Sequence, residues 1–209
     1  MCSANALLRH IHQSHPPRRL TSCILLMTAT SLHLAQPVVV GCIQACQRSI
    51  AMIDALTDAQ FAQPVGRHSS IGAHLRHCIE HFQRFATGIQ AAHGATPVIS
   101  YDSRERDREL EANRLASRRA IEAILLFLQS DALTHPEGEV LVELIPARGA
   151  DMARLNSTVE RELVFLSSHA IHHLALMEVL AELQGIDLPP NTGLAYSTDA
   201  HRAKMGSNS

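Results

Sequence analysis

The sequence predicts an all-α fold, a four-helix bundle with a small hairpin before the last long helix. Four stretches of roughly twenty residues place apolar side chains at three- and four-residue steps, the spacing of one helix face. The connectors between them are of medium length, and helices joined in this way pack around a shared core. Aromatic residues make up only 3% of the chain, so this core must be aliphatic.

The first two helices follow from apolar spacing and from capping residues. The first helix is expected over residues 37–56, where one apolar stripe is formed by Val39, Ile43, Cys46, Ile50 and Ile53. A polar segment broken by Pro64 and Gly66 follows it. Ser69 or Ser70 is then expected to cap the second helix, over residues 71–94, which carries four histidines.

The spacing of the apolar residues changes from helical to alternating between the third helix and the hairpin. The charged connector "ATPVISYDSRERDREL" leads into the helix "ELEANRLASRRAIEAILLFLQSDAL", whose expected buried face is Leu115, Ala116, Ile121, Ile124, Leu125 and Leu128. After it, Val140, Val142 and Leu144 alternate with Leu141 and Glu143. A turn near Arg148 and Gly149 returns the chain, which predicts two short strands.

The last long helix is marked at both ends. Ser157 and Glu160 have the spacing of a capping box, which predicts the start of the helix. The helix is expected to continue to Gln184 and to stop at Gly185, with Pro189 and Pro190 beyond it.

The two ends of the chain have no periodic apolar face. Residues 1–35 mix basic residues, Pro16-Pro17 and a short apolar run at residues 23–27, so we expect a disordered extension, or an over-extended start with Met27 as the natural one, rather than a signal peptide. Residues 36–198 are expected to form the single domain, and residues 199–209 a frayed, flexible tail.

Charge and cysteine usage narrow the class of protein. A formal charge of -2 offers no basic surface for nucleic acid or anionic lipid, so neither partner is expected, and no membrane-spanning run is seen. The five cysteines form no Cys-x-x-Cys pair, which is typical of free thiols in a cytoplasmic protein. Cys42 and Cys46 are expected to be buried structural thiols.

Histidines at helical spacing are the strongest functional signal. His169 and His173 are four residues apart and share one helix face, although about one such pair is expected by chance among fourteen histidines. A second set, His74, His77 and His81, shares a face of the second helix. Three neutral imidazoles from facing helices would suit zinc, nickel or iron and leave coordination positions open, whereas the alternative is a polar histidine surface.

These histidines, in "SIGAHLRHCIEHF" and "SSHAIHHLALMEVLAELQG", resemble the motif of the DinB-like (YfiT-related) superfamily. The resemblance implies a DinB-like up-down four-helix bundle, often a homodimer, that binds a divalent ion, with zinc or nickel first and iron or manganese next. Its metal ligands would fall on His77, His169 and His173. It also implies a small-molecule substrate, a low-molecular-weight thiol in characterised relatives, and does not imply DNA binding.

Two functions are compatible with this resemblance. One is a metal-dependent thiol transferase or hydrolase, with His74, His81 and His172 as acid–base or supporting residues beside the ligands. The other is a non-catalytic metal-binding or stress-related helical dimer. Tyr101 and Asp102 could reach the mouth of the site, but a solvent-exposed turn with ion pairs among residues 104–107 is the simpler expectation.

Other chemistries lack their motifs. A di-iron site would need paired Glu-x-x-His motifs, and neither Glu80-His81 nor Glu162 has that spacing. The chain has no G-x-S-x-G nucleophile elbow and no phosphate-binding glycine loop.

Overall fold

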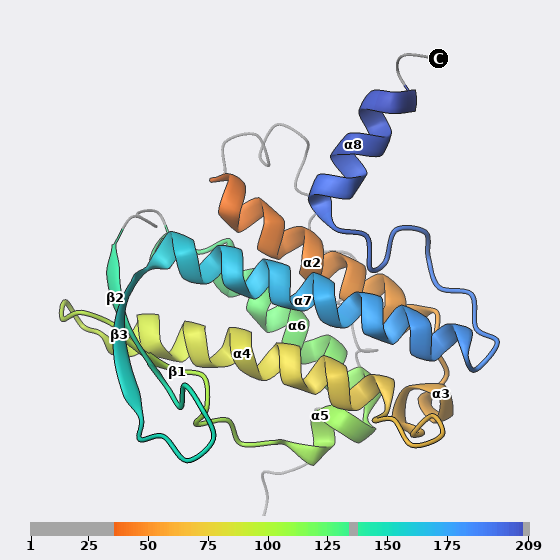
Figure 1. Cartoon of the computed structure of the whole chain (residues 1–209), viewed down its shortest axis with the longest axis horizontal. Coiled ribbons are helices and arrows are strands. Elements are labelled where there is room, and N and C mark those ends of the chain that lie inside the picture. Colours follow the sequence, from red (N-terminus) through yellow and green to blue (C-terminus); the bar gives the residue numbers. More distant parts are fainter. Residues whose placement is uncertain (1–35, 134–137, 207–209) are drawn as a thin grey trace, which may run out of the picture.

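The computed structural model describes residues 36–133 and 138–206, which are mostly helical (Figure 1). The long helices are α2 (Pro37–Asp54), α4 (Ile71–Ala91), α6 (Arg114–Leu128) and α7 (Val159–Glu182). Shorter ones are α3 (Asp58–Ala62), α5 (Arg108–Ala112), a 3-10 turn (Asp131–Leu133) and α8 (Tyr196–Gly206). The expected extension, residues 1–35, lies outside the described residues.

The four long helices pack side by side around a core that is mostly aliphatic, although Phe61, Phe82 and Phe85 are buried in it as well. α7 contacts α2 and α4, and α6 contacts the same two helices from the other side (Figure 1). The largest fully buried side chains include Ile43, Phe85, Leu163 and Leu174, one or more from three of these helices. The apolar face of each helix therefore faces the other helices, as the three- and four-residue spacing predicts.

A three-stranded sheet corrects the all-α prediction. β2 (Glu139–Leu144) and β3 (Ala153–Thr158) form the predicted antiparallel hairpin, with Val142 opposite Leu155. β1 (Val98–Ser100), which the sequence places in a connector, pairs with β2 in parallel. Its three residues are too few to show alternation, and its partner strand lies about forty residues away, so no local pattern marks it.

The segments around the helices differ from the prediction in two places. α3 lies in the segment expected to be irregular, and a capping box between Thr57 and Gln60 starts it. The expected third helix is divided, because the Asn113 side chain caps α6 by accepting from the backbone N–H groups of Leu115 and Ala116. Leu115, expected in the core, is 51% exposed. Six residues separate it from the buried Ile121, which at 3.6 residues per turn places it about 120° away from that face.

Of the N-terminal caps predicted for α4 and α7, the structure confirms one. Ser70 caps α4 by accepting from the backbone N–H of Ala73, as predicted. The cap of α7 is Thr158, so the predicted capping box at Ser157 is wrong. Ser157 instead lies in β3 and donates its hydroxyl hydrogen to the buried Glu162 carboxylate at 2.6 Å.

The C-terminal segment forms the helix α8 where a frayed tail was expected. None of its side chains is buried, and it extends away from the other helices (Figure 1). Its first residue, Tyr196, attaches the segment to α2 because the phenol donates to the Gly41 carbonyl at 2.7 Å.

Within the described residues, α7 is the one helix long and apolar enough to cross a membrane by length and composition. It is also the helix with the most buried positions, among them Leu163, Leu166, Ala170, Leu174 and Met177. The core helix of a globular protein can have the same composition, so one such helix is weak evidence for a membrane span.

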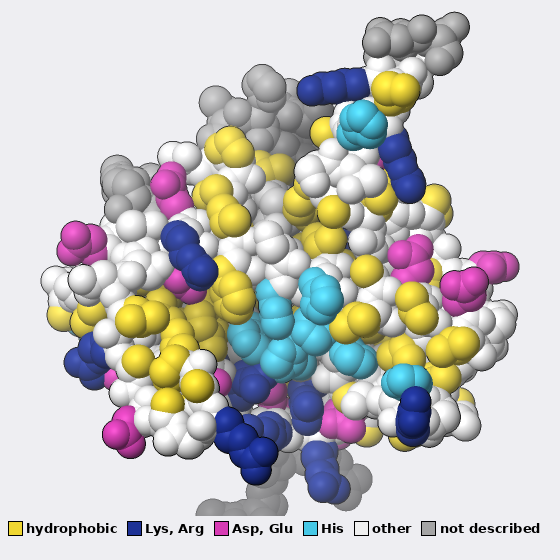
Figure 2. Space-filling view, in the orientation of Figure 1, with side chains coloured by type: hydrophobic (Ala, Val, Ile, Leu, Met, Phe, Trp, Pro, Cys, Tyr) yellow, Lys and Arg dark blue, Asp and Glu magenta, His cyan; other side chains and the backbone are white. Residues whose placement is uncertain are grey.

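Histidine side chains gather in the middle of one face of the molecule, over α4 and α7 (Figure 2). Basic side chains border them on one side and hydrophobic side chains on the side of the sheet (Figure 2).

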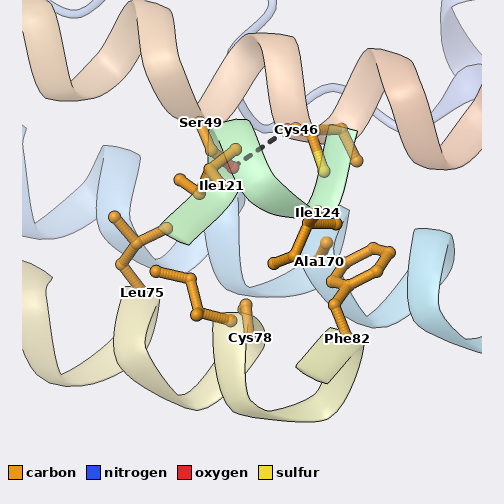
Figure 3. Close-up of a pocket in the computed structure, with 10 residues that line it drawn as sticks. Cys46, Ser49, Leu75, Cys78, Phe82, Ile121, Ile124 and Ala170 are labelled. Carbon is orange, nitrogen blue, oxygen red and sulfur yellow. Dashed lines mark hydrogen bonds between the residues drawn. The ribbon is translucent and has the colours of Figure 1, made fainter. Parts of the chain in front are cut away.

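The buried cysteines lie away from this face, in the helical core. Cys46 and Cys78 line a cavity of about 10 Å³ together with Leu75, Ile121 and Ala170 (Figure 3). Burial raises the pKa of the Cys42 thiol to about 12 and that of Cys46 well above its ordinary value. Thiols held protonated in this way are poor nucleophiles, which agrees with the structural role expected from the sequence.

Candidate metal centre

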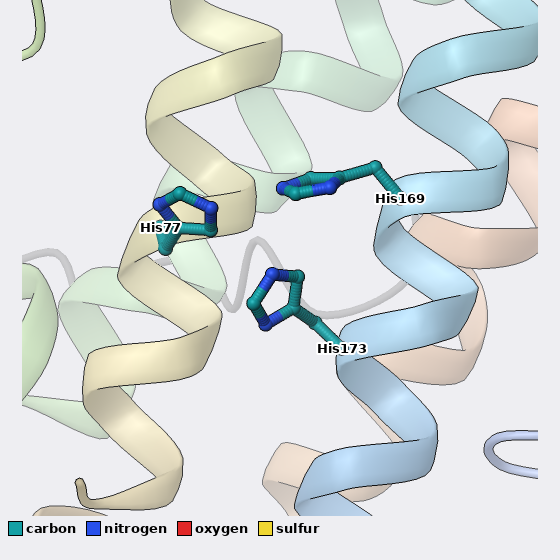
Figure 4. A group of neighbouring side chains, drawn as sticks. All are labelled: His77, His169 and His173. Carbon is teal, nitrogen blue, oxygen red and sulfur yellow. The ribbon is translucent and has the colours of Figure 1, made fainter. Parts of the chain in front are cut away.

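Three histidines from two neighbouring helices converge on one point. α4 positions His77, and α7 positions His169 and His173 one turn apart (Figure 4). One ring nitrogen from each lies within 4.8 Å of the others. The HxxxH spacing on α7 and the packing of α4 against α7 therefore bring together the three residues named from the sequence.

Hydrogen bonds select the nitrogen that each ring presents. The Nδ1 atom of His173 is 3.1 Å from Nδ1 of His74, and Nδ1 of His77 contacts the Arg104 guanidinium. The Nε2 atom of His173 remains for a ligand, and that of His77 becomes available once Arg104 no longer donates to its ring. Nε2 of His169 is buried and has no hydrogen-bond partner. An unpaired buried nitrogen is costly, and a metal ion would satisfy it, so this donor set fits a divalent ion.

The imidazoles are held in the neutral form that binds metals. Burial, followed by the charges of neighbouring groups, lowers the pKa of His77 and of His173 to about 3. The same two causes lower the pKa of His169 to about 4. At neutral pH, protons therefore do not compete with an ion for these nitrogens.

The three histidines next to this cluster, His74, His81 and His172, differ in their burial and in their contacts. His81 is buried, and its Nδ1–H donates to the His77 carbonyl at 2.7 Å. Its ring centroid lies 4.4 Å from that of His77 and 4.6 Å from that of His169. His74 contacts His173 as described above, whereas His172 is exposed and its ring centroid lies 5.5 Å from that of His173.

A buried carboxylate supports the cluster from the sheet side. Glu162 accepts a hydrogen bond from the Tyr101 hydroxyl at 2.8 Å. The Tyr101 ring stacks on His81 at 5.3 Å and also contacts Phe165, which stacks on His169. Tyr101 thus reaches the site, which was the less favoured of the two alternatives left open by the sequence. Asp102 instead accepts from the backbone N–H of Ile145 and ties the connector to the hairpin.

Arg104 and Glu80 are the residues whose place the sequence does not indicate. Arg104 was expected in a turn with solvent-exposed ion pairs, but its guanidinium contacts His77. Burial lowers the pKa of Arg104, and the Glu80 carboxylate is the largest opposing charge. Glu80 is 3% exposed and faces the connector rather than a metal ligand set. Arg104 reaches His77, and Glu80 reaches Asp107, only because residues 101–107 fold back over α4. No spacing in the sequence indicates this path of the connector.

Comparison with known proteins identifies the family of the chain. Part of the chain, over 109 residues, is 32% identical to FK506-binding protein 5 of Rhizopus delemar; the match covers 52% of this chain and 28% of that protein. No solved structure matches the chain. The family model of the DinB superfamily matches residues 43–177, a range that includes all three converging histidines. The chain belongs to the DinB superfamily.

Proposed function

We propose that this protein is a metal-dependent enzyme, a thiol transferase or a hydrolase, whose centre is His77, His169 and His173. The observation that carries the proposal is the convergence of three neutral imidazoles, one with an unpaired buried nitrogen, on an accessible face. In this proposal α2, α4, α6 and α7 are the up-down four-helix bundle of the family. Zinc or nickel are the first candidates for the ion, and iron or manganese the next.

A divalent ion in this position supplies Lewis acidity, which lowers the pKa of a neighbouring thiol or water. The residues of the chain would bind the ion, position the neighbouring rings and accept a proton. His77, His169 and His173 would hold the ion, and Tyr101 would fix the His81 ring through stacking while Glu162 fixes Tyr101. The Nε2 atom of His81 is the acceptor nitrogen of its ring, since Nδ1 donates, so His81 is our candidate proton acceptor.

The substrate would approach from the face in Figure 2, between hydrophobic and basic side chains. We propose a small molecule that carries a thiol, as the family resemblance implies. We further propose that the protein is cytoplasmic and forms a homodimer. The dimer is supported by the exposed apolar side chains of Leu176 and Val179 on α7 and of Leu183 at its C-terminal cap. Neither a nucleic acid nor a membrane is a partner in this proposal.

The first experiment is elemental analysis of untagged protein purified without chelators. About one equivalent of metal is expected in the wild type, with at least about a tenfold loss of affinity in His77→Ala, His169→Ala and His173→Ala. His201→Ala is the control, because His201 is an exposed histidine of α8, which contributes no residue to the converging set. Equal metal content in all five proteins would contradict the ligand assignment. Thiol-transfer and hydrolase assays with the bound ion would then test the reaction.

A non-catalytic metal site is the second candidate, and His81 is the observation that favours it. A fourth imidazole lies close to two of the three proposed ligands. If its Nε2 completed a four-histidine set, no position would remain for a substrate, and the site would be structural. His81→Ala separates the two functions: loss of metal as severe as in His77→Ala favours the structural site, whereas retained metal with lost activity favours the enzyme.

A further inference from the structure

Arg104 holds His77 in a form that cannot bind an ion. A guanidinium has only donors, so Nδ1 of His77 must accept the hydrogen bond from Arg104 Nη1. A neutral imidazole carries one proton, which in this arrangement lies on Nε2. A nitrogen that carries a proton has no lone pair in the ring plane to offer to a metal ion. The contact with Arg104 therefore removes His77 from the ligand set.

Neither ring nitrogen of His77 can bind an ion while Arg104 stays. If the ion takes Nε2, the ring proton moves to Nδ1, and two N–H groups face each other. If the ion takes Nδ1, the guanidinium occupies its position. His173 differs, because its neighbour His74 is an imidazole that can either donate or accept, so that contact survives metal binding.

Glu80 is placed to receive the displaced guanidinium. Its Oε1 atom accepts from the backbone N–H of Asp107 at 2.8 Å, but its Oε2 atom is buried without a hydrogen-bond partner. Nε of Arg104 is also buried without a partner. Both residues line one polar pocket of about 310 Å³. An unpaired buried carboxylate oxygen is costly, and a guanidinium is the group that would satisfy it most strongly.

We propose that Arg104 and the divalent ion compete for His77, and that Glu80 receives the Arg104 guanidinium when the ion binds. Before metal binding, the Arg104 cation lies against the imidazoles. After metal binding, the Arg104–Glu80 ion pair neutralises the positive charge that would otherwise repel the ion. The inference rests on the proposed function, since it needs a metal at the three histidines.

The test is a titration of the full chain with zinc or nickel against a chromophoric chelator at constant pH. Arg104→Met removes the competitor, so metal affinity is expected to rise at least about tenfold, and Arg104→Ala should behave alike. Glu80→Gln keeps an Oε1 acceptor for Asp107 but loses the charge, so affinity is expected to fall about tenfold. In the double variant Arg104→Met/Glu80→Gln, the loss of metal affinity caused by Glu80→Gln should disappear, because no guanidinium remains to pair with residue 80. Arg84→Met is the matched control: Arg84 lines the same pocket, but its Nε–H donates to the Ser100 carbonyl.

The outcomes separate this inference from the proposed function. Metal binding by the wild type with unchanged or weaker binding by both Arg104 variants overturns the competition and leaves the metal site intact. The same loss from Glu80→Gln with and without Arg104 overturns the part assigned to Glu80. No binding by the wild type or by either Arg104 variant overturns both proposals. Binding that is detectable only when Arg104 is replaced supports both.

Discussion

At the scale of single residues, the site depends on histidines that are kept neutral by their surroundings. His77, His169 and His173 lie partly buried among one another, with the Arg104 cation beside them. Protonating any of these rings would place a further positive charge in this cluster, where burial already disfavours charge. The same arrangement that prepares the nitrogens for a metal therefore makes the metal-free protein sensitive to acid.

The metal-free protein is expected to lose stability as the pH falls below about 6.5. The folded-state pKa values of His77 and His173 are lowered to about 3, and that of His169 to about 4, whereas the unfolded chain titrates near the ordinary value of 6.5. Between these values the unfolded state binds more protons, so the stabilisation is complete above the unfolded pKa and is lost as the pH falls toward the folded ones.

Urea unfolding of chelator-treated protein between about pH 7.5 and 4.5 measures this dependence. The double substitution His77→Gln/His173→Gln should flatten the curve, and His201→Gln, at an exposed position of α8 outside the cluster, should leave it unchanged. A wild-type curve that is flat over this range would contradict the neutral, buried state of the cluster.

At the scale of elements, α4 carries the site because it approaches its neighbours closely on both sides of the histidines. A Cβ atom on Gly72 would lie 2.1 Å from the Glu111 carbonyl oxygen and 2.7 Å from the Phe61 ring. Gly88 approaches the backbone of β1 in the same way, with the Val98 carbonyl oxygen 2.7 Å from the corresponding position. These two glycines allow α5 and β1 to pack directly on α4, and the connector between β1 and α5 then crosses the site.

Gly72→Ala is expected to destabilise the fold by about 1–3 kcal/mol, the usual cost of forcing an extra carbon into a packed contact. The backbone of α5 has to move, since the nearest atom belongs to the main chain. Thermal or urea unfolding measures the loss. Gly206→Ala is the control, because a Cβ at that helical position meets nothing within 4 Å. Equal stability of the two variants would show that α5 is not held against α4 in this way.

At the scale of the whole molecule, the segment after α7 returns across α2 and closes one side of the helical core. Arg48 of α2 donates to the Leu194 carbonyl at 2.6 Å, and its guanidinium lies 5.0 Å from the Tyr196 ring centroid. The Tyr196 hydroxyl bonds Gly41. The Asp199 carboxylate of α8 also lies 3.6 Å from the Arg48 guanidinium, but no α8 side chain is buried, so the first turn of α8 contributes more to stability than its later residues.

Two truncations test this division of the C-terminal segment. A chain that ends at Ala200 keeps Tyr196 and is expected to unfold within about 0.5 kcal/mol of the full chain. A chain that ends at Leu194 loses the phenol hydrogen bond and the contact with Arg48, which together contribute about 1–2 kcal/mol. Metal content should be equal in both. A large loss of stability in the chain that ends at Ala200 would contradict the small contribution assigned to the later residues of α8.

The sequence by itself determined the features that depend on local spacing. A three- and four-residue apolar period marks the long helices, the Ser70 cap starts α4, and an HxxxH spacing places His169 and His173 on one face of α7. Each of these signals lies within one or two helical turns, where side chains related by the period are neighbours whatever the rest of the chain does.

The tertiary structure alone decided which residues from distant segments meet. β1 pairs with β2 across about forty residues, Tyr101 reaches Glu162 across 61 positions, and Arg104 contacts His77 across 27. The cap by Asn113 also divided the expected third helix into α5 and α6. Contacts of this kind depend on how the connectors fold over α4, and no periodic pattern records that path, because the energy of each contact arises only after the helices have packed.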